Sequence, residues 1–308
     1  MGRFGRPLFF RAERVPDHNA PAQRTGNDWR NQPPRLLLPA GVADSPRVAA
    51  FLGTVSLLML LGWVTDVTWG GIAASLLFFR NIRGRGESIG HMWSLSIEAQ
   101  FYLVWPWVLS RLDQRRAFIG STCLIVGCWI WRTYAIIAKL YSYEGGKFYI
   151  RTDFRIDSIL IGCWIAVAWS DPRVRERMTS VARHFYPLLF LPALGVWSFY
   201  AERFVFLRPV FLTLQTVLAS VVFLWLLSES DDSVTTRLLS QPMIVWFGRL
   251  SYSLYLWQQI FLVTQTPLWG AVRRVPLNLV LTLAVASVSY YGIEKRFLRL
   301  KRRYETSN

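Results

Sequence analysis

A few ionisable side chains interrupt the long apolar stretches of this chain, and these residues are the ones most able to do chemistry. Glu98 stands in the run HMWSLSIEAQFYLVWP at residues 91–106, where a buried carboxylate is costly unless it is used or paired. His91 opens the same run and could act as a general base. Arg132 falls within another apolar stretch. Inside a membrane, residues of this kind predict a functional site.

A second set of charges alternates along the segment YIRTDFRIDSILIGCWIA, at Arg151, Asp153, Arg155 and Asp157. Residues four apart share a helix face, so the two arginines lie together, and the two aspartates likewise, if a helix begins early. An arginine of this set could bind a phosphate or a polar sugar while an aspartate orients a hydroxyl. The alternative is a self-neutralising network whose side chains extend to the membrane surface.

Glu98 also has a purely structural interpretation. Ser94 can act as the N-cap of a helix, which puts Glu98 in the first turn, where a negative charge complements the helix dipole. Ser94, Glu98 and Tyr102 then fall on one face. His91 would be an ordinary residue exposed on the preceding loop, and Glu294, beside Lys295, a paired charge at a helix end.

The composition indicates the elements that must position these residues. Hydrophobic residues make up 53% of the chain and charged residues only 18%, which is too apolar for an ordinary soluble domain. We therefore expect an all-α fold, a polytopic membrane bundle of about eight transmembrane helices. The expected spans are residues 48–65, 95–110, 117–137, 156–170, 187–200, 209–228, 247–266 and 276–292.

The basic residues predict the orientation of the bundle. The net charge is +16, but the basic residues lie between the spans rather than on one face, which argues against nucleic acid as a partner. Alternate connecting segments hold 22 Lys and Arg on one side and 11 on the other, so both termini are expected to be cytoplasmic. The chain divides into a basic segment 1–47, a membrane domain 48–294 and a basic tail 295–308. The three cysteines lie in apolar spans without metal-ligand spacing, so no metal is expected.

Four motifs carry a resemblance to a known family. HMWSLSIEAQFYLVWP resembles the signature of membrane acyltransferase family 3, with the pattern W-S-L-x-x-E-x-Q-F-Y-L-x-x-P. The segments RIDSILIGCWIA, WFGRLSYSLYLW and YYGIEKRF resemble later motifs in the family's order, and SLLFFRNI resembles the segment before the signature. Together these segments cover roughly residues 70 to 300.

The resemblance implies an integral-membrane O-acyltransferase of the bacterial cytoplasmic membrane. Such an enzyme moves an acyl group, often acetyl, from a cytoplasmic acyl-CoA-type donor to a hydroxyl of an envelope glycan, a lipid-linked sugar or a secreted small molecule. No bound cofactor is implied, and the partners are the bilayer and the acceptor. The implied site comprises Glu98 and His91 for catalysis, Arg151, Arg155, Asp157, Ser251 and Tyr252 for the acceptor, and Arg35 for the phosphates of the donor.

The sequence departs from the family pattern in three places. Family members carry a catalytic histidine in an early apolar span, and no such segment occurs in this chain. The segment RNQPPRLLLPA keeps Arg35 but has Gln32 where a second arginine is expected, and Gln258 stands where a histidine is common. These departures predict an N-terminally truncated or divergent member. The alternatives to an active enzyme are an inactive remnant, an accessory subunit, or a transporter or flippase of glycan intermediates.

Overall fold

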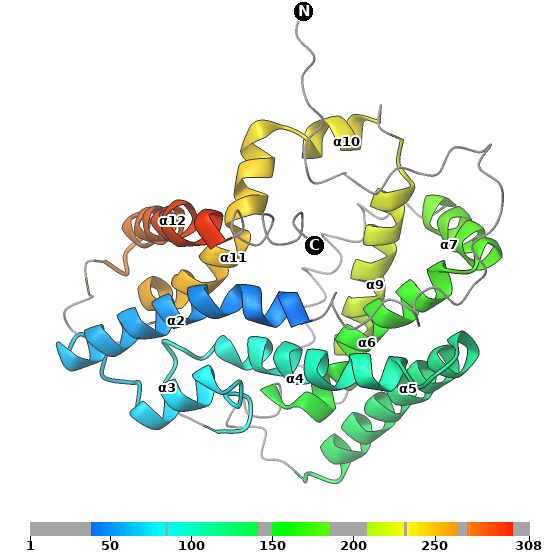
Figure 1. The fold of residues 1–308 in the computed structure, drawn as a ribbon, viewed down its shortest axis with the longest axis horizontal. Helices are drawn as coiled ribbons and strands as arrows, with labels where there is room; N and C mark the ends of the chain where they lie inside the picture. Colours follow the sequence, from blue (N-terminus) through cyan, green and yellow to red (C-terminus); the bar gives the residue numbers. More distant parts are fainter. Residues whose placement is uncertain are drawn as a thin grey trace, which may run out of the picture.

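The computed structural model describes residues 38–83, 86–140, 150–184, 208–230, 233–263, 270 and 272–297. Within these ranges every regular element is a helix, which confirms the all-α prediction for this part of the chain (Figure 1). The helices are α2 (Leu38–Leu60), α3 (Trp69–Leu76), α4 (Met92–Leu109), α5 (Gln114–Ile137), α6 (Thr152–Trp169), α7 (Pro172–His184), α9 (Arg208–Ser228), α10 (Val234–Leu239), α11 (Pro242–Leu262), α12 (Leu277–Ser289) and the π-helix η8 (Tyr290–Glu294).

Seven of the eight expected spans coincide with helices of the structure. The expected span 187–200 lies outside the described residues. Among the described helices, Gln114–Ile137 and Leu277–Phe297 are long and apolar enough to cross a membrane, and Pro46–Leu60 and Leu212–Ser228 are shorter apolar helices. The structure therefore confirms that seven of the expected spans are helical. That the chain crosses the membrane eight times stays a prediction.

The helices pack in two groups. Helices α2, α3, α11 and α12 share one apolar core, in which Phe51, Leu52 and Val55 of α2 meet Leu256 and Ile260 of α11. Helices α5, α6, α7 and α9 pack against one another in the other half of the molecule (Figure 1). We call these the α2–α11–α12 group and the α5–α6–α9 group.

Helix α4 joins the two groups. Its first turns contribute Met92 and Leu95 to the core of the α2–α11–α12 group. Later turns contribute Phe101 and Trp105, which pack with Leu160 of the α5–α6–α9 group. Both ends of α4 are thus fixed by apolar burial, which places its middle turns, and Glu98 with them, between the two groups.

The helix that carries Glu98 begins earlier than its capping pattern predicts. The N-cap position is His91, whose side chain makes no capping hydrogen bond, so the prediction that Ser94 is the N-cap is wrong. The Ser94 hydroxyl instead donates to the carbonyl oxygen of His91, at 3.2 Å. The start of α4 is therefore held by tertiary contacts, and Glu98 lies in its second turn.

Candidate active site

The polar groups around Glu98 come from α4 and α11. The Tyr255 hydroxyl of α11 donates to the His91 carbonyl oxygen at 2.7 Å, and it also makes a hydrogen bond with the Ser94 hydroxyl. Glu98 lies one turn after Ser94, on the same face of α4. Ser94, Glu98 and Tyr255 are each half-buried. We call these three residues with His91 the junction site.

His91 is buried, which corrects the expectation that it is exposed on a loop. Only 4% of its surface is accessible. Its ring packs edge-on against Phe51, with centroids 5.4 Å apart, and against Tyr255, with centroids 5.1 Å apart. Its backbone N–H donates to the side-chain oxygen of Gln259 at 3.2 Å. Three helices, α2, α4 and α11, therefore meet around this residue.

The imidazole of His91 has little polar compensation for its burial. Neither ring nitrogen has a partner in hydrogen-bonding geometry among the described residues. Burial lowers the pKa of His91 from 6.5 to about 4, and the side chain of Gln259 and the backbone of Leu256 offset only part of that effect. At neutral pH the ring is therefore uncharged.

Arg155 and Trp93 extend the junction site toward the α5–α6–α9 group. The guanidinium of Arg155, on α6, lies over the ring of Trp93, on α4, at 5.3 Å from its centroid. Arg151 instead forms an ion pair with Asp153 at 2.9 Å, and both side chains are more than one-third exposed. The indole N–H of Trp131 also donates to Asp153, at 2.8 Å. Of the two arginines, the structure places Arg155 against the helix that carries Glu98.

Asp157 is fully buried and is bonded to protein groups. Its carboxylate forms an ion pair with Arg132 at 3.0 Å and accepts a hydrogen bond from the Thr213 hydroxyl at 2.9 Å. Asp157 and Arg132 both have side chains with no exposed surface. In this structure the carboxylate of Asp157 therefore faces the protein interior rather than a ligand.

A partly buried amide network was not predicted from the sequence. The side chain of Gln100 donates to the Phe78 carbonyl at 2.8 Å and accepts from the Thr152 hydroxyl at 2.8 Å. The amide of Asn81 donates to Thr152 at 2.6 Å. The one sequence signal for this network is the position of Gln100, two residues after Glu98 in the signature. The network ties α4 to the first turn of α6.

The remaining predicted acceptor residues lie on α11, about one turn before Tyr255. Ser251 is exposed, and its hydroxyl donates to the Gly248 carbonyl of its own helix at 2.8 Å. The ring of Tyr252 lies under the guanidinium of Arg47, 4.8 Å from the ring centroid. Arg47 forms a buried ion pair with Glu294 at 3.3 Å, so Glu294 is paired as expected, but with a residue of α2. The predicted donor contact Arg35 lies outside the described residues.

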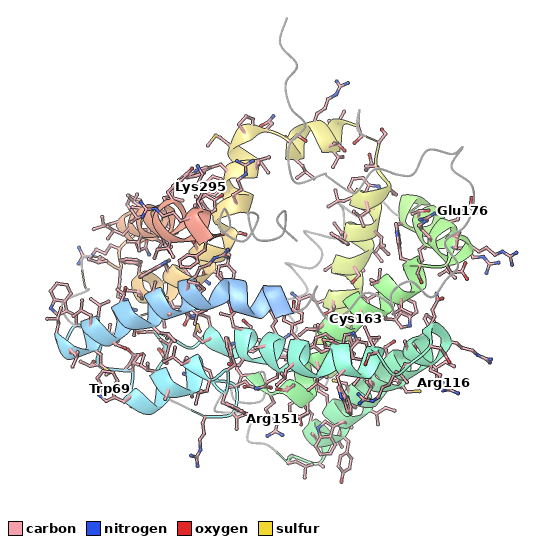
Figure 2. The ribbon with its side chains drawn as sticks, in the orientation of Figure 1. Trp69, Arg116, Arg151, Cys163, Glu176 and Lys295 are labelled. Atoms are coloured by element: carbon pink, nitrogen blue, oxygen red, sulfur yellow. The ribbon has the colours of Figure 1, made fainter. Side chains whose placement is uncertain are left out.

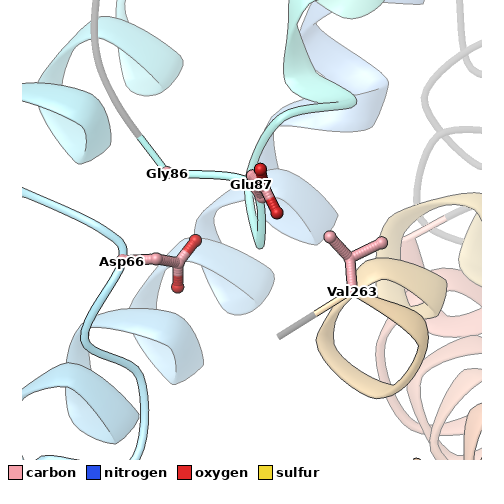
Figure 3. Close-up of a pocket in the computed structure, with 4 residues that line it drawn as sticks. All are labelled: Asp66, Gly86, Glu87 and Val263. Atoms are coloured by element: carbon pink, nitrogen blue, oxygen red, sulfur yellow. The ribbon is translucent and has the colours of Figure 1, made fainter. Parts of the chain in front are cut away.

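A pocket of about 240 Å³ opens beside the loop that leads to His91 (Figure 3). Asp66, Gly86, Glu87 and Val263 line it. Asp66 already accepts hydrogen bonds from the backbone N–H and the hydroxyl of Ser88, at 2.9 and 2.8 Å. Within the described ranges no three histidine, cysteine or acidic residues gather as metal ligands.

Fold and site together define a bundle of apolar helices with a half-buried carboxylate and two hydroxyls at the junction of its two halves. The profile of the family described as "Acyltransferase domain" matches residues 35–292, so the chain belongs to this membrane-associated acyltransferase family. The match spans every helix from α2 to α12.

Several curated proteins are similar to the chain. YrhL of Bacillus subtilis strain 168, a peptidoglycan O-acetyltransferase candidate, is 28% identical over 242 residues, which cover 74% of this chain and 37% of YrhL. The O-acetyltransferase OatA of Staphylococcus aureus is 25% identical over 234 residues, 68% of this chain and 36% of OatA. The peptidoglycan O-acetyltransferase OatA of Listeria monocytogenes is 25% identical over 246 residues, 73% of this chain and 38% of that protein.

The chain thus matches little more than one-third of the length of these relatives. No solved structure matches the chain significantly.

Proposed function

We propose that this chain is a membrane O-acyltransferase that transfers an acyl group, typically acetyl, from an acyl-CoA-type donor to a hydroxyl of an envelope glycan. The single observation that carries the proposal is the junction site. Glu98 of the family signature lies one helical turn after Ser94, whose hydroxyl is hydrogen-bonded to that of Tyr255. Family membership and the printed names of the relatives support the same reaction class, with peptidoglycan as the acceptor favoured by two of those names.

The reaction needs a base, hydrogen-bond donors and a site that excludes water. The acceptor hydroxyl gives its proton to the base, and its oxygen attacks the carbonyl carbon of the thioester. The carbon–sulfur bond then breaks, and the thiolate of the donor leaves and takes up a proton. The thioester is already activated, so the protein's own residues suffice for these steps.

We assign the base to Glu98. Burial lowers the pKa of His91 to about 4, which is close to the ordinary pKa of a carboxyl group. His91 is therefore no stronger a base than a carboxylate. The hydroxyls of Ser94 and Tyr255 donate to the His91 carbonyl in this structure, and rotation of either one away from it would supply a donor to the oxygen that becomes negative in the transition state. The His91 ring packs against the Tyr255 ring, and the His91 backbone carbonyl accepts a hydrogen bond from the Tyr255 hydroxyl. These two contacts fix the position of that hydroxyl.

Arg155 is proposed to bind the acceptor. Its guanidinium is permanently charged and lies over Trp93, five residues before Glu98. A cation in this place fits an acceptor that carries a phosphate or carboxylate near its reactive hydroxyl. Arg151, at the exposed start of α6, is proposed as a second contact, and Arg35 as the contact of the donor's phosphates.

The experiment that tests the function is acetyl transfer by the full chain in liposomes. Purified protein is reconstituted, given acetyl-CoA with a labelled acetyl group, and supplied with soluble peptidoglycan fragments. We expect labelled ester on the glycan, removable by mild base. Donor turnover without an ester on any hydroxyl acceptor, or no turnover at all, would contradict the proposal and favour an inactive remnant or accessory subunit. Movement of unmodified glycan across the bilayer would favour a transporter.

A further inference from the structure

A fully buried ion pair inside the α5–α6–α9 group lies away from the junction site. Arg132 of α5 donates to both oxygens of Asp157 of α6, at 3.4 and 3.0 Å. It also bonds to the hydroxyl of Thr213 of α9, which itself donates to Asp157. Three helices therefore meet at one buried ion pair, within the described part of this group.

Arg132 also holds the backbone of α6. Its guanidinium donates to the carbonyl oxygen of Phe154 at 2.6 Å. Phe154 directly precedes Arg155, and Asp157 follows Arg155 by two residues. The guanidinium therefore fixes the turn of α6 that carries Arg155, on the side of the helix that faces α5.

The same turn is fixed from the opposite side by α4. Thr152 donates to Gln100 at 2.8 Å, and Gln100 lies two residues after Glu98 on α4. Arg155 itself lies over Trp93 of α4. The first turns of α6 are thus held between Arg132 on one side and the signature helix on the other.

We propose that Arg132 and Asp157 are positioning residues for the acceptor, and that they act by fixing Arg155 beside the junction site. The inference rests on the proposed function and adds to it the part that α5 takes in binding the acceptor. A buried ion pair is weak evidence for a role in stability alone, since apolar residues of similar size often replace such pairs without loss. The contact with the Phe154 carbonyl, in contrast, is directional and is specific to the turn that carries Arg155.

The test uses a paired substitution that keeps apolar volume, Arg132→Met with Asp157→Leu. A purely structural pair predicts a folded protein with wild-type kinetics. The positioning role predicts a folded protein whose kcat/KM for the acceptor falls by roughly 100-fold, as a displaced contact produces, while KM for acetyl-CoA is unchanged. Arg116→Met removes an exposed arginine from the other end of α5 and serves as the matched control, with wild-type kinetics expected.

A second variant tests the same proposal if the first variant does not fold. Arg132→Lys keeps the charge but cannot span Phe154, Asp157 and Thr213 at once, so we expect the same selective loss for the acceptor. Wild-type kcat/KM for the acceptor in either folded variant would overturn the proposal.

Hydrogen exchange separates this inference from the proposed function, because it needs no substrate. Faster exchange of the amides of residues 152–158 in the variants, with α11 and α12 unchanged, is expected whether or not the chain transfers acyl groups. Unchanged exchange in that segment would overturn the positioning role on its own.

Discussion

At the scale of single residues, burial decides what His91 can do. The pKa of His91 is about 4 in the folded protein and 6.5 in the unfolded chain. As the pH falls below 6.5, the unfolded chain takes up a proton at His91 while the folded protein keeps this residue neutral. Between these two pH values the unfolded state therefore binds more protons than the folded state. The free energy of unfolding must fall as the pH drops through 6.5, and the loss is complete below about 4.

We predict that this loss amounts to roughly 3 kcal/mol in full, of which about 2 kcal/mol falls between pH 7 and pH 5, from the difference between the two pKa values. The measurement is the thermal unfolding midpoint of the protein in detergent between pH 5 and 7, a window above the range in which most carboxylates titrate. Replacing His91→Gln should flatten the pH dependence. The same slope in the variant and the wild type would show that His91 is not the titrating group.

The residues of the junction site were only partly predictable. Spacing along one helix predicts that Ser94 and Glu98 share a face, and this relation needs no tertiary structure. Tyr255 lies 161 residues from Ser94 in the sequence, and only packing of α11 against α4 brings their hydroxyls together. Asp157 shows the same limit, because alternating charges at 151–157 do not reveal that one carboxylate turns inward to Arg132.

At the scale of elements, the loop before α4 depends on a close approach at Gly90. A Cβ there would lie 3.0 Å from the Glu87 carbonyl oxygen and 3.2 Å from the side-chain oxygen of Gln259. Gln259 is the group that accepts the His91 backbone N–H. A side chain at Gly90 must therefore displace either the loop or the contact that holds the start of α4.

We predict that Gly90→Ala destabilises the protein by roughly 1–3 kcal/mol, as overpacking does. The matched control is Gly53→Ala on α2, where an added Cβ meets nothing within 4 Å and the better helix propensity of alanine favours the fold. Unfolding midpoints of the two variants are compared. Equal midpoints would contradict the close approach.

A buried ion pair joins the first half of α2 to the end of η8. Arg47 and Glu294 have side chains only 8% and 7% exposed, and the Ser253 hydroxyl donates to Glu294 at 3.0 Å. Glu294→Gln leaves the arginine without its charge partner, so we expect a loss of about 3–5 kcal/mol in the free energy of unfolding. Arg116→Ala, in an exposed pair with Asp113, should cost less than about 1 kcal/mol. A comparable effect of the two substitutions in denaturant unfolding would refute this difference.

Helix positions were largely predictable because apolar windows mark them directly, whereas helix ends were not. Helix α2 begins at Leu38, ten residues before the expected span, and α4 begins at Met92, three residues before its expected start. Asp113, in contrast, caps α5 by a local hydrogen bond to the Arg116 N–H at 2.7 Å. Local caps can be read from the sequence, but starts held by tertiary contacts cannot.

At the scale of the whole molecule, contacts between helix ends agree with the predicted alternation of those ends between two faces. Arg47, just before the expected span 48–65, meets Glu294 at the end of η8, and both are expected at the cytoplasmic face. The start of α5 meets the end of α6, where Gln114 donates to the Ser170 hydroxyl at 2.7 Å. The end of α5 and the starts of α6 and α9 meet through Arg132, Asp157 and Thr213, and these three helix ends are expected at the opposite face. The packing thus groups the helix ends as the alternation of basic residues predicts, and the choice of the cytoplasmic face stays a prediction.

We predict that Glu87 lies outside the cytoplasm and Arg116 inside. Both are exposed, so cysteines introduced there can react with a membrane-impermeant maleimide. In cells whose native cysteines Cys123, Cys128 and Cys163 have been replaced, Glu87→Cys should be labelled in intact cells. Arg116→Cys should be labelled only after permeabilisation. The reverse pattern would contradict the predicted topology.

The central claim is that Glu98 takes the acceptor's proton. The most direct measurement is the rate of ester formation by Glu98→Gln in liposomes, with acetyl-CoA and peptidoglycan fragments as substrates. Glu176→Gln, on exposed helix α7 at the periphery of Figure 2, is the matched control. Loss of a general base predicts a fall in kcat of roughly 100-fold or more for Glu98→Gln at an unchanged amount of folded protein. Ester formation by Glu98→Gln at the rate of the wild type and of Glu176→Gln would contradict the claim.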